Sequence, residues 1–184
     1  MSGIGPVIID LETNGLLNDA TRIHCSAIHY CEDNITDSYN DEKIGKGMSS
    51  PVVRSITDIE MASHIIGHNI VGFDLPLIKS IYHWFNPVGV IIDTLLLSRL
   101  YHPNLLSIDK VHAWKHMPLQ LYGRHSLEAY GYRLNEYKGN FGATTDWSDW
   151  SQEMEDYCIQ DVKVTVKLWN HFQKYLNGSH SNIR

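Results

Sequence analysis

The hydrophobic and polar positions of this chain follow two periods, which separate predicted strands from predicted helices. Apolar runs, one of them alternating roughly at period two, predict strands over residues 6–12, 22–30, 34–39, 64–67 and 88–92. Apolar positions at helical spacing predict helices over 74–85, 94–100, 125–131 and 151–176, and a capping box of Thr57 and Glu60 predicts a short helix over 57–63. Strands that come first and then alternate with helices indicate a three-layer, mixed α/β domain.

The length of 184 residues fits one folded domain, which we place at residues 1–178, with a tail over 179–184 that we expect to be disordered. The three cysteines form no CxxC pair, which is typical of a reducing compartment. The first twelve residues carry no positively charged signal region, and no stretch free of Asp, Glu, Lys and Arg is long enough to span a membrane. We therefore expect a protein of the cytoplasm.

Charge is distributed unevenly along the chain, which holds 15 basic and 21 acidic residues and a net charge of −6. This balance excludes a polybasic coat protein for nucleic acid. Residues 99–138 are the exception, because basic residues outnumber acidic ones there and alternate with aromatic rings. That mixture fits contacts to a nucleic-acid strand, although surface scatter of charge and core packing of the rings are alternatives. The side chains concerned are Arg99, Lys115, Arg124, Arg133 and Lys138, with Trp114, Tyr122, Tyr130 and Tyr132.

Two acidic residues, Asp10 and Glu12, follow three apolar residues in the first predicted strand. Period two places both side chains on the same face of that strand. Neighbouring like charges repel unless a cation stands between them. A solvated strand end is the alternative interpretation of this pair.

Two further carboxylates lie in the predicted helices. Asp74 begins a helix in the segment GHNIVGFDLPLI, where Asp is also a favoured N-cap. Asp161 lies in the middle of the last helix, with Tyr157 one turn before it on the same face, and this pair also fits a simple contact on a helix surface. A strand pair, a helix-start Asp and a mid-helix Asp converge on one site only if they share a cation.

The combined carboxylates indicate a site for hard metal ions. Oxygen ligands in this number suit Mg²⁺ or Mn²⁺ rather than zinc. Two such ions about 4 Å apart are the apparatus of in-line phosphoryl displacement. The sequence has no GxxxxGK loop, so use of ATP is not indicated, and no GxSxG nucleophile motif.

Three segments resemble the motifs of a known enzyme superfamily. IDLET (9–13), GHNIVGFDLPLI (67–78) and YCIQD (157–161) are similar to the motifs of the DEDD 3′→5′ exonucleases, and the spacing of Tyr157 and Asp161 is that of the DEDDy branch. Residues 92–105, 125–139 and 156–165 further resemble the proofreading exonuclease domain of family A DNA polymerases from short-tailed phages. The resemblance covers about residues 6–176 and includes no polymerase palm, fingers or thumb.

The resemblance implies a ribonuclease H-like fold, with helices flanking a mixed five-stranded central sheet, and a two-metal site. Asp10 would bridge two Mg²⁺ or Mn²⁺ ions, Glu12 and Asp161 would hold the ion beside the attacking water, and Asp74 would hold the other ion partly through water. Tyr157 would orient the attacking water. Contacts to the terminal nucleotides of the substrate would come from Leu11, Thr13, Leu16, His68, Asn69 and Phe73, of which His68 fits a structural role equally well.

We therefore expect a metal-dependent 3′→5′ exonuclease that acts on single-stranded DNA and releases nucleoside 5′-monophosphates. An exoribonuclease similar to ribonuclease D shares the three motifs, and an inactive exonuclease fold that binds within a replication or repair assembly is a further alternative. The expected partners are single-stranded DNA 3′ ends and a separate polymerase or other replication or recombination protein, with no membrane. If the protein is encoded by a phage, its location is the host cytoplasm.

Overall fold

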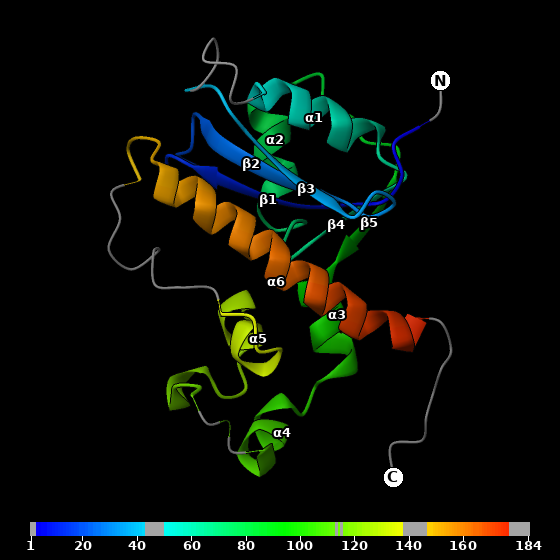
Figure 1. The fold of residues 1–184 in the computed structure, drawn as a ribbon, viewed down its shortest axis with the longest axis vertical. Coiled ribbons are helices and arrows are strands. Elements are labelled where there is room, and N and C mark those ends of the chain that lie inside the picture. The colour runs from blue at the N-terminus through cyan, green and yellow to red at the C-terminus, as the bar shows by residue number, and fades with distance from the viewer. Residues whose placement is uncertain (1–2, 43–49, 113, 115, 138–146, 177–184) are drawn as a thin grey trace.

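Five strands form the central sheet of the protein, whose computed structural model describes residues 3–42, 50–112, 114, 116–137 and 147–176 (Figure 1). The strands are β1 (Val7–Thr13), β2 (Ile23–Tyr30), β3 (Ile35–Asn40), β4 (His64–Gly67) and β5 (Val90–Asp93). They lie in the order β3-β2-β1-β4-β5, with β1 antiparallel to β2 and parallel to β4. β3 is antiparallel to β2, and β5 is parallel to β4. The predicted mixed five-stranded sheet is confirmed; the predicted tail at 179–184 lies outside the described residues.

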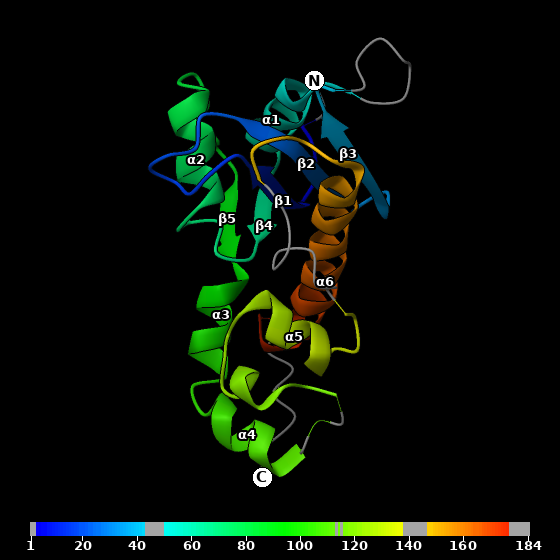
Figure 2. The same ribbon diagram turned by 90° about the vertical axis from the view of Figure 1, so that its left-hand side faces the viewer.

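Helices cover both faces of this sheet, so the three-layer arrangement is also confirmed. The helices are α1 (Val52–Met61), α2 (Asp74–Ile81), α3 (Thr94–Tyr101), α4 (Leu105–His112), α5 (Leu127–Arg133) and α6 (Gln152–Leu176), with a short 3₁₀ helix at Leu119–Leu121. α1 and α2 lie on one face and α6 crosses the other, while α3, α4 and α5 extend beyond the sheet (Figures 1 and 2). Among the described residues, no helix combines the length and the apolar character that crossing a membrane requires.

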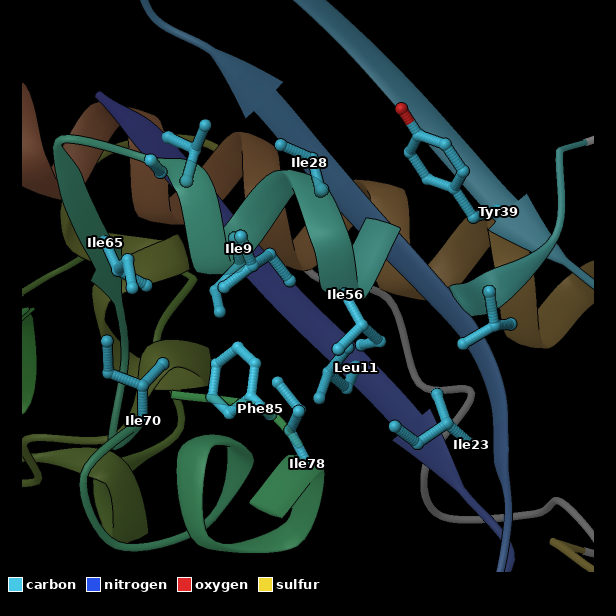
Figure 3. Packing of buried hydrophobic residues seen from close by; sticks show 14 of the residues in the cluster. Ile9, Leu11, Ile23, Ile28, Tyr39, Ile56, Ile65, Ile70, Ile78 and Phe85 are labelled. Carbon is cyan, nitrogen blue, oxygen red and sulfur yellow. The ribbon is translucent and has the colours of Figure 1, made fainter. Parts of the chain in front are cut away.

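The alternation of side chains along β1 divides the core into two layers. Val7, Ile9 and Leu11 point into the cluster beneath α1 and α2, where Ile56 and Phe85 are also buried (Figure 3). Ile8 points to the opposite face and packs with residues of α6 such as Met154, Cys158 and Val162. Period two therefore assigns the even-numbered residues of β1 to the side of the sheet that α6 covers.

The helices beyond the sheet pack on the second half of α6. Their buried cluster combines Leu105, Leu127 and Tyr130 with residues of α6. Because α6 runs from the sheet into this cluster, one long helix carries both the central layer and the outer helices. The outer helices are thereby held at a fixed place relative to the sheet.

The structure corrects the predicted start of the first helix. α1 begins at Val52 and not at Thr57, whose hydroxyl lies inside the helix and donates a hydrogen bond to the carbonyl of Val53 at 3.0 Å. Val52, Ile56 and Ile59 form the buried face at helical spacing, which is the signal that locates this helix. The capping-box pattern was therefore a coincidence of spacing.

The structure also shortens one predicted helix and adds another. α2 ends at Ile81 and not at Phe85, because Lys79 bonds the carbonyl oxygens of His83 and Phe85 in the turn that follows. α4 was not predicted at all. Its buried residues are Leu105 and Asp109, while Leu106 and Val111 are exposed, so its hydrophobic pattern does not mark the buried face.

Candidate active site

Asp10 and Glu12 lie near the carboxyl end of β1, on the face that α6 covers. A ligand atom from each of Asp10, Glu12 and Cys158 lies within 4.8 Å of the others. Glu12 is buried and Asp10 is partly buried, so both carboxylates have lost much of their hydration. The structure thus brings together the strand pair that the sequence singles out; the predicted function of the pair as metal ligands stays a prediction.

Asp74 lies where the chain enters α2 after the carboxyl end of β4. It is the first residue of α2 and not its N-cap, which is Phe73. The pKa of Asp74 is raised to about 7, first by burial and further by the neighbouring charges of Asp93 and Asp161. A hydrogen bond from the backbone of Leu11 opposes that rise and places the Asp74 carboxylate beside β1.

Asp161 joins this group from α6. It is 3% exposed, and its charge acts on Asp74. One turn earlier on the same helix, the thiol of Cys158 donates a hydrogen bond to the carbonyl of Asp10 at 3.4 Å, which docks α6 against β1. Asp74 and Asp161 therefore lie near each other beside β1, the strand that carries Asp10 and Glu12, while the group of ligand atoms within 4.8 Å of one another is Asp10, Glu12 and Cys158. Tyr157 is half-buried on α6, one turn before Asp161.

Cys158 is a member of this cluster that the sequence did not mark. Burial and the neighbouring Cys25 raise the pKa of its thiol well above the usual value, as do the charges of Asp10 and Glu12. A protonated thiol is a poor ligand for a hard cation, which prefers oxygen. Cys158 therefore acts as a packing residue beneath the carboxylates.

The loop between β4 and α2 is held from behind by Asp93 at the end of β5. Its carboxylate accepts backbone N–H groups from Asn69 at 3.0 Å, Val71 at 3.1 Å and Leu95 at 2.9 Å. Asn69 has a positive φ of 67°, which Asn tolerates better than most residues. Asp93 was missed as a functional residue, although an Asp directly before a predicted helix is a recognisable N-cap signal.

His68 belongs to the same loop and is held by a chain of hydrogen bonds. The hydroxyl of Thr94 donates to the carbonyl of Gly67 at 3.1 Å, so its oxygen accepts from Nδ1 of His68 at 2.9 Å. At Gly67 an added Cβ would lie 2.2 Å from the side chain of Ile70 and 3.1 Å from the carbonyl oxygen of Ile9, so glycine permits the close approach of this loop to β1. The hydrogen bond between His68 and Thr94 favours a structural role for His68.

An apolar cavity of about 280 Å³ lies beside Glu12. Four of the predicted substrate residues line it: Leu11, Thr13, Leu16 and Phe73. Leu16 is 75% exposed, so its side chain is accessible to a ligand in this cavity. The lining formed by the described residues does not include His68 or Asn69, and it adds Gly15 and Trp147, which the sequence did not single out.

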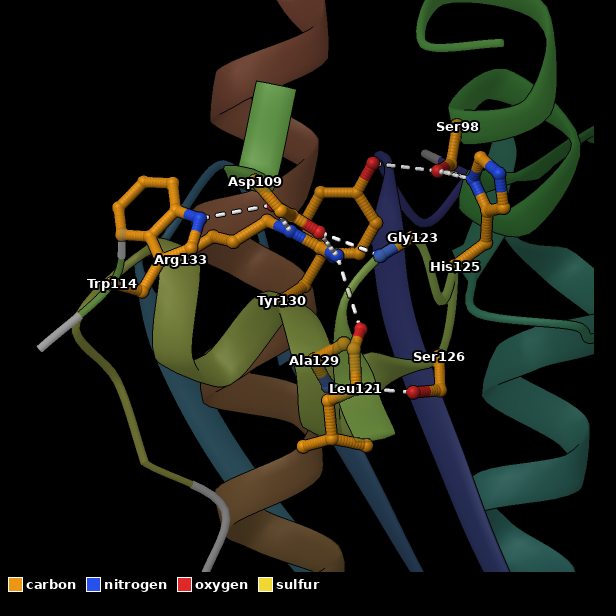
Figure 4. Close-up of polar contacts among 10 residues, drawn as sticks. All are labelled: Ser98, Asp109, Trp114, Leu121, Gly123, His125, Ser126, Ala129, Tyr130 and Arg133. Carbon is orange, nitrogen blue, oxygen red and sulfur yellow. Dashed lines mark hydrogen bonds and ion pairs between the residues drawn. The ribbon is translucent and has the colours of Figure 1, made fainter. Parts of the chain in front are cut away.

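The basic segment contributes less positive surface than its sequence indicates. Arg133 forms a buried ion pair with Asp109, at 2.7 Å between Nη2 and Oδ2, and is therefore not exposed (Figure 4). Tyr130 is buried in the outer cluster, and the indole of Trp114 donates to Asp109. Arg99 and Arg124 are exposed, whereas Lys115 and Lys138 lie outside the described residues. For Arg133 and Tyr130, the prediction of strand contacts is replaced by core packing.

Comparisons with known proteins relate the chain to phage DNA polymerases. It is 30% identical to a DNA-directed DNA polymerase of Enterobacteria phage T3 and 29% identical to one of Escherichia phage T7, each over 95% of this chain. The aligned region is 27% of each polymerase, so the chain spans about a quarter of their length. No protein-family model matches the chain. The predicted resemblance to phage DNA polymerases is confirmed.

The fold recurs among solved structures. The apo form of a nuclease matches it with a TM-score of 0.55 and 19% sequence identity, over 96% of this chain and 77% of that chain. At this identity the likeness establishes the fold alone. The predicted ribonuclease H-like fold class is confirmed.

Proposed function

We propose that the protein is a metal-dependent 3′→5′ exonuclease of the DEDDy branch, which removes nucleoside 5′-monophosphates from the 3′ end of single-stranded DNA. The observation that carries this proposal is the close pair of Asp10 and Glu12 on β1, with Asp74 and Asp161 nearby, beside an apolar cavity that Glu12 lines. A hydrolase that acts on a nucleotide end needs both parts, one for the phosphate and one for the base. The relation to two phage DNA polymerases supports DNA as the substrate.

The donor set fits hard divalent cations. The carboxylates of Asp10, Glu12, Asp74 and Asp161 supply oxygen ligands only, which is the set that Mg²⁺ and Mn²⁺ prefer. Burial raises the pKa of Asp74, the charges of Asp93 and Asp161 raise it further, and a bound cation would oppose this rise. Two bound ions would activate the attacking water and stabilise the leaving oxygen of the phosphodiester.

The chain's own side chains would orient the substrate and the water. Tyr157, through its hydroxyl, would position the attacking water next to Asp161. Leu16 would contact the terminal base, and Phe73 would form an aromatic floor beneath it. Thr13 is nearly buried and its hydroxyl donates to the carbonyl of Gly15 at 2.8 Å, so it would act by fixing the loop that presents Leu16.

The chain spans about a quarter of the length of its polymerase relatives. We propose that a separate polymerase, or another replication or recombination protein, presents the DNA 3′ ends. This would place the protein in DNA replication or repair, and in the host cytoplasm if a phage encodes it.

A time course with 5′-labelled strands tests the proposal. Single-stranded DNA with a free 3′ end should shorten as a one-nucleotide ladder in Mg²⁺ or Mn²⁺, and a closed circular strand should resist. Ca²⁺ should support binding without efficient cleavage, because its looser coordination positions water poorly. Full activity in excess EDTA would contradict the two-metal site. Preferential cleavage of the matched RNA strand would identify an exoribonuclease, and binding without cleavage in any metal would identify an inactive module.

A further inference from the structure

The chain segment before α6 adds a side chain to the apolar cavity that no sequence motif marks. Trp147 is half-buried and lines this cavity with Leu16, Phe73 and residues of β1. We propose that the indole ring of Trp147 stacks on the base of the 3′-terminal nucleotide and sets the affinity for ends that carry a base. This inference rests on the proposed function and deepens it.

The backbone of Trp147 is tied to the central sheet at an irregularity in strand pairing. Opposite β1, Glu12 pairs with Cys25 and Thr13 pairs with Ile23, which leaves His24 as an extra residue in β2. Nε2 of the buried His24 donates to the carbonyl of Trp147 at 3.0 Å, because a carbonyl can only accept. Bulges beside active sites commonly redirect one side chain. Here the redirected side chain holds the segment that carries Trp147.

The side chain of Trp147 is supported as well as its backbone. It packs against the buried cluster between the sheet and α6, which includes Cys25, Met154 and Cys158. A ring held by packing and by an anchored backbone loses little conformational freedom when a ligand binds, and this favours affinity. The same cluster carries the docking contact between Cys158 and Asp10. Trp147 and the carboxylates therefore keep a fixed relation to each other.

The chemistry of the cavity selects the base as the part of a nucleotide that Trp147 meets. Glu12 forms one part of the lining, so the phosphate would lie on that side, beside the carboxylates that would hold the cations. The remaining walls come mainly from Leu11, Leu16, Phe73 and Trp147, which suit a flat and weakly polar group. Every base has a π-face, so stacking on Trp147 would tolerate all four bases.

Substrate ends with and without a base test this assignment. Trp147→Ala and Trp147→Phe are compared with wild type on 5′-labelled strands that end in a nucleotide or in an abasic residue. For base-bearing ends we expect Trp147→Ala to raise KM about 5-fold to 150-fold with little change in kcat, since stacking of one base contributes in this range. On abasic ends wild type and Trp147→Ala should be alike, and Trp147→Phe should restore most of the affinity for base-bearing ends.

Controls separate this inference from the proposed function. Trp84→Ala removes an indole that is 48% exposed between α2 and β5, and it should leave both substrates unchanged. Equal loss on base-bearing and abasic ends, or no change in Trp147→Ala, would overturn the stacking assignment. If the wild type cleaves no strand at all, the proposed function is wrong. Binding of the same strands in Ca²⁺, measured by fluorescence anisotropy, then decides the inference. Weaker binding of base-bearing ends alone by Trp147→Ala supports it. Equal affinities of wild type and Trp147→Ala for base-bearing ends, or no binding by either protein, reject it.

Discussion

Two buried carboxylates, Asp74 at the candidate active site and Asp109 on α4, have opposite electrostatic surroundings. Asp74 is 5% exposed, and burial with acidic neighbours raises its pKa to about 7. Asp109 is also fully buried; burial alone would raise its pKa, but hydrogen bonds led by that of Arg133 hold the pKa below the ordinary value. Both groups have left water, so the difference comes from their neighbours.

The contrast separates a carboxylate that stabilises the fold from one that awaits a ligand. Asp109 receives two hydrogen bonds from Arg133, one from the indole of Trp114 and one from the backbone of Gly123 (Figure 4). These contacts join α4 to the end of α5 and to the segment that precedes α5. Asp74 instead lies among Asp93 and Asp161, an arrangement that costs folding free energy until a cation binds. Buried acids of the second kind point to function.

The largest expected effect is on turnover, when one of the four carboxylates of the proposed metal site is replaced. Asp161→Asn should lower the single-turnover rate on DNA by about 10³-fold to 10⁵-fold, because a metal-positioning group is lost. The metal-free protein should be as stable as wild type or more so, since one charge of a repulsive group is removed. Rate and urea midpoint are measured on the same preparations. Asp156→Asn, an exposed neighbour on α6, is the matched control and should change neither. A normal rate in Asp161→Asn would place the chemistry elsewhere.

The ion pair of Asp109 and Arg133 should affect stability instead, because its loss should destabilise the fold. Arg133→Met leaves the buried Asp109 carboxylate without its cation and should lower the free energy of unfolding by about 3–5 kcal/mol. Urea unfolding measures this loss. Arg22→Met is the control, because its ion pair with Glu42 is exposed and should be worth less than about 1 kcal/mol. If the two variants lost the same stability, the ion pair of Asp109 and Arg133 would not be the element that holds the outer helices.

The pH dependence of stability distinguishes Asp74 from Asp109, because their pKa values are shifted in opposite directions. The folded state holds a proton on Asp74 up to about pH 7, whereas the unfolded chain releases it near the ordinary value of 3.8. The free energy of unfolding of the metal-free protein should therefore fall as pH rises through this window, by at most about 4 kcal/mol from this group. Asp74→Asn should lack this decline.

Urea unfolding of both proteins in EDTA from pH 4 to pH 7 measures the difference. His102 and His171, whose pKa values are lowered by burial, titrate in both proteins and cancel. Asp109 acts oppositely, since its lowered pKa gives stability that is lost only as pH falls below the ordinary range. Parallel curves for wild type and Asp74→Asn would show that Asp74 is ionised throughout.

The carboxylates of the predicted metal site can be singled out from the sequence because their signals are local. Asp10 and Glu12 follow an apolar run in β1, and Asp161 interrupts the apolar face of a long helix, so each is visible in a short window of sequence. Asp93 and Trp147 were missed because their contacts are distant in sequence. Asp93 bonds amides 24 and 22 residues earlier, and Trp147 is held by His24. No window of helical length contains either relation.

The ion pair of Asp109 and Arg133 could not be predicted from the sequence for a related reason. α4 buries Asp109 one turn after Leu105, so a periodicity of apolar residues does not detect it. The partner charge, Arg133, lies 24 residues later and was interpreted as a contact to nucleic acid. Only the folded chain shows that these two charges meet. A basic segment in a sequence is therefore weak evidence for a binding surface until buried pairs are removed from it.

The smallest expected effect comes from removing one of the hydrogen-bond donors to Asp109. Trp114→Phe keeps an aromatic ring but removes the hydrogen bond of 2.9 Å from Nε1 to Oδ1 of Asp109. Asp109 keeps Arg133 and the backbone of Gly123, so the free energy of unfolding should fall by only about 1–2 kcal/mol. Urea unfolding measures the loss, and turnover on DNA should stay unchanged. A loss as large as that of Arg133→Met would mean that the donors of Asp109 act as one cooperative network, in which no single contact can be removed without the others.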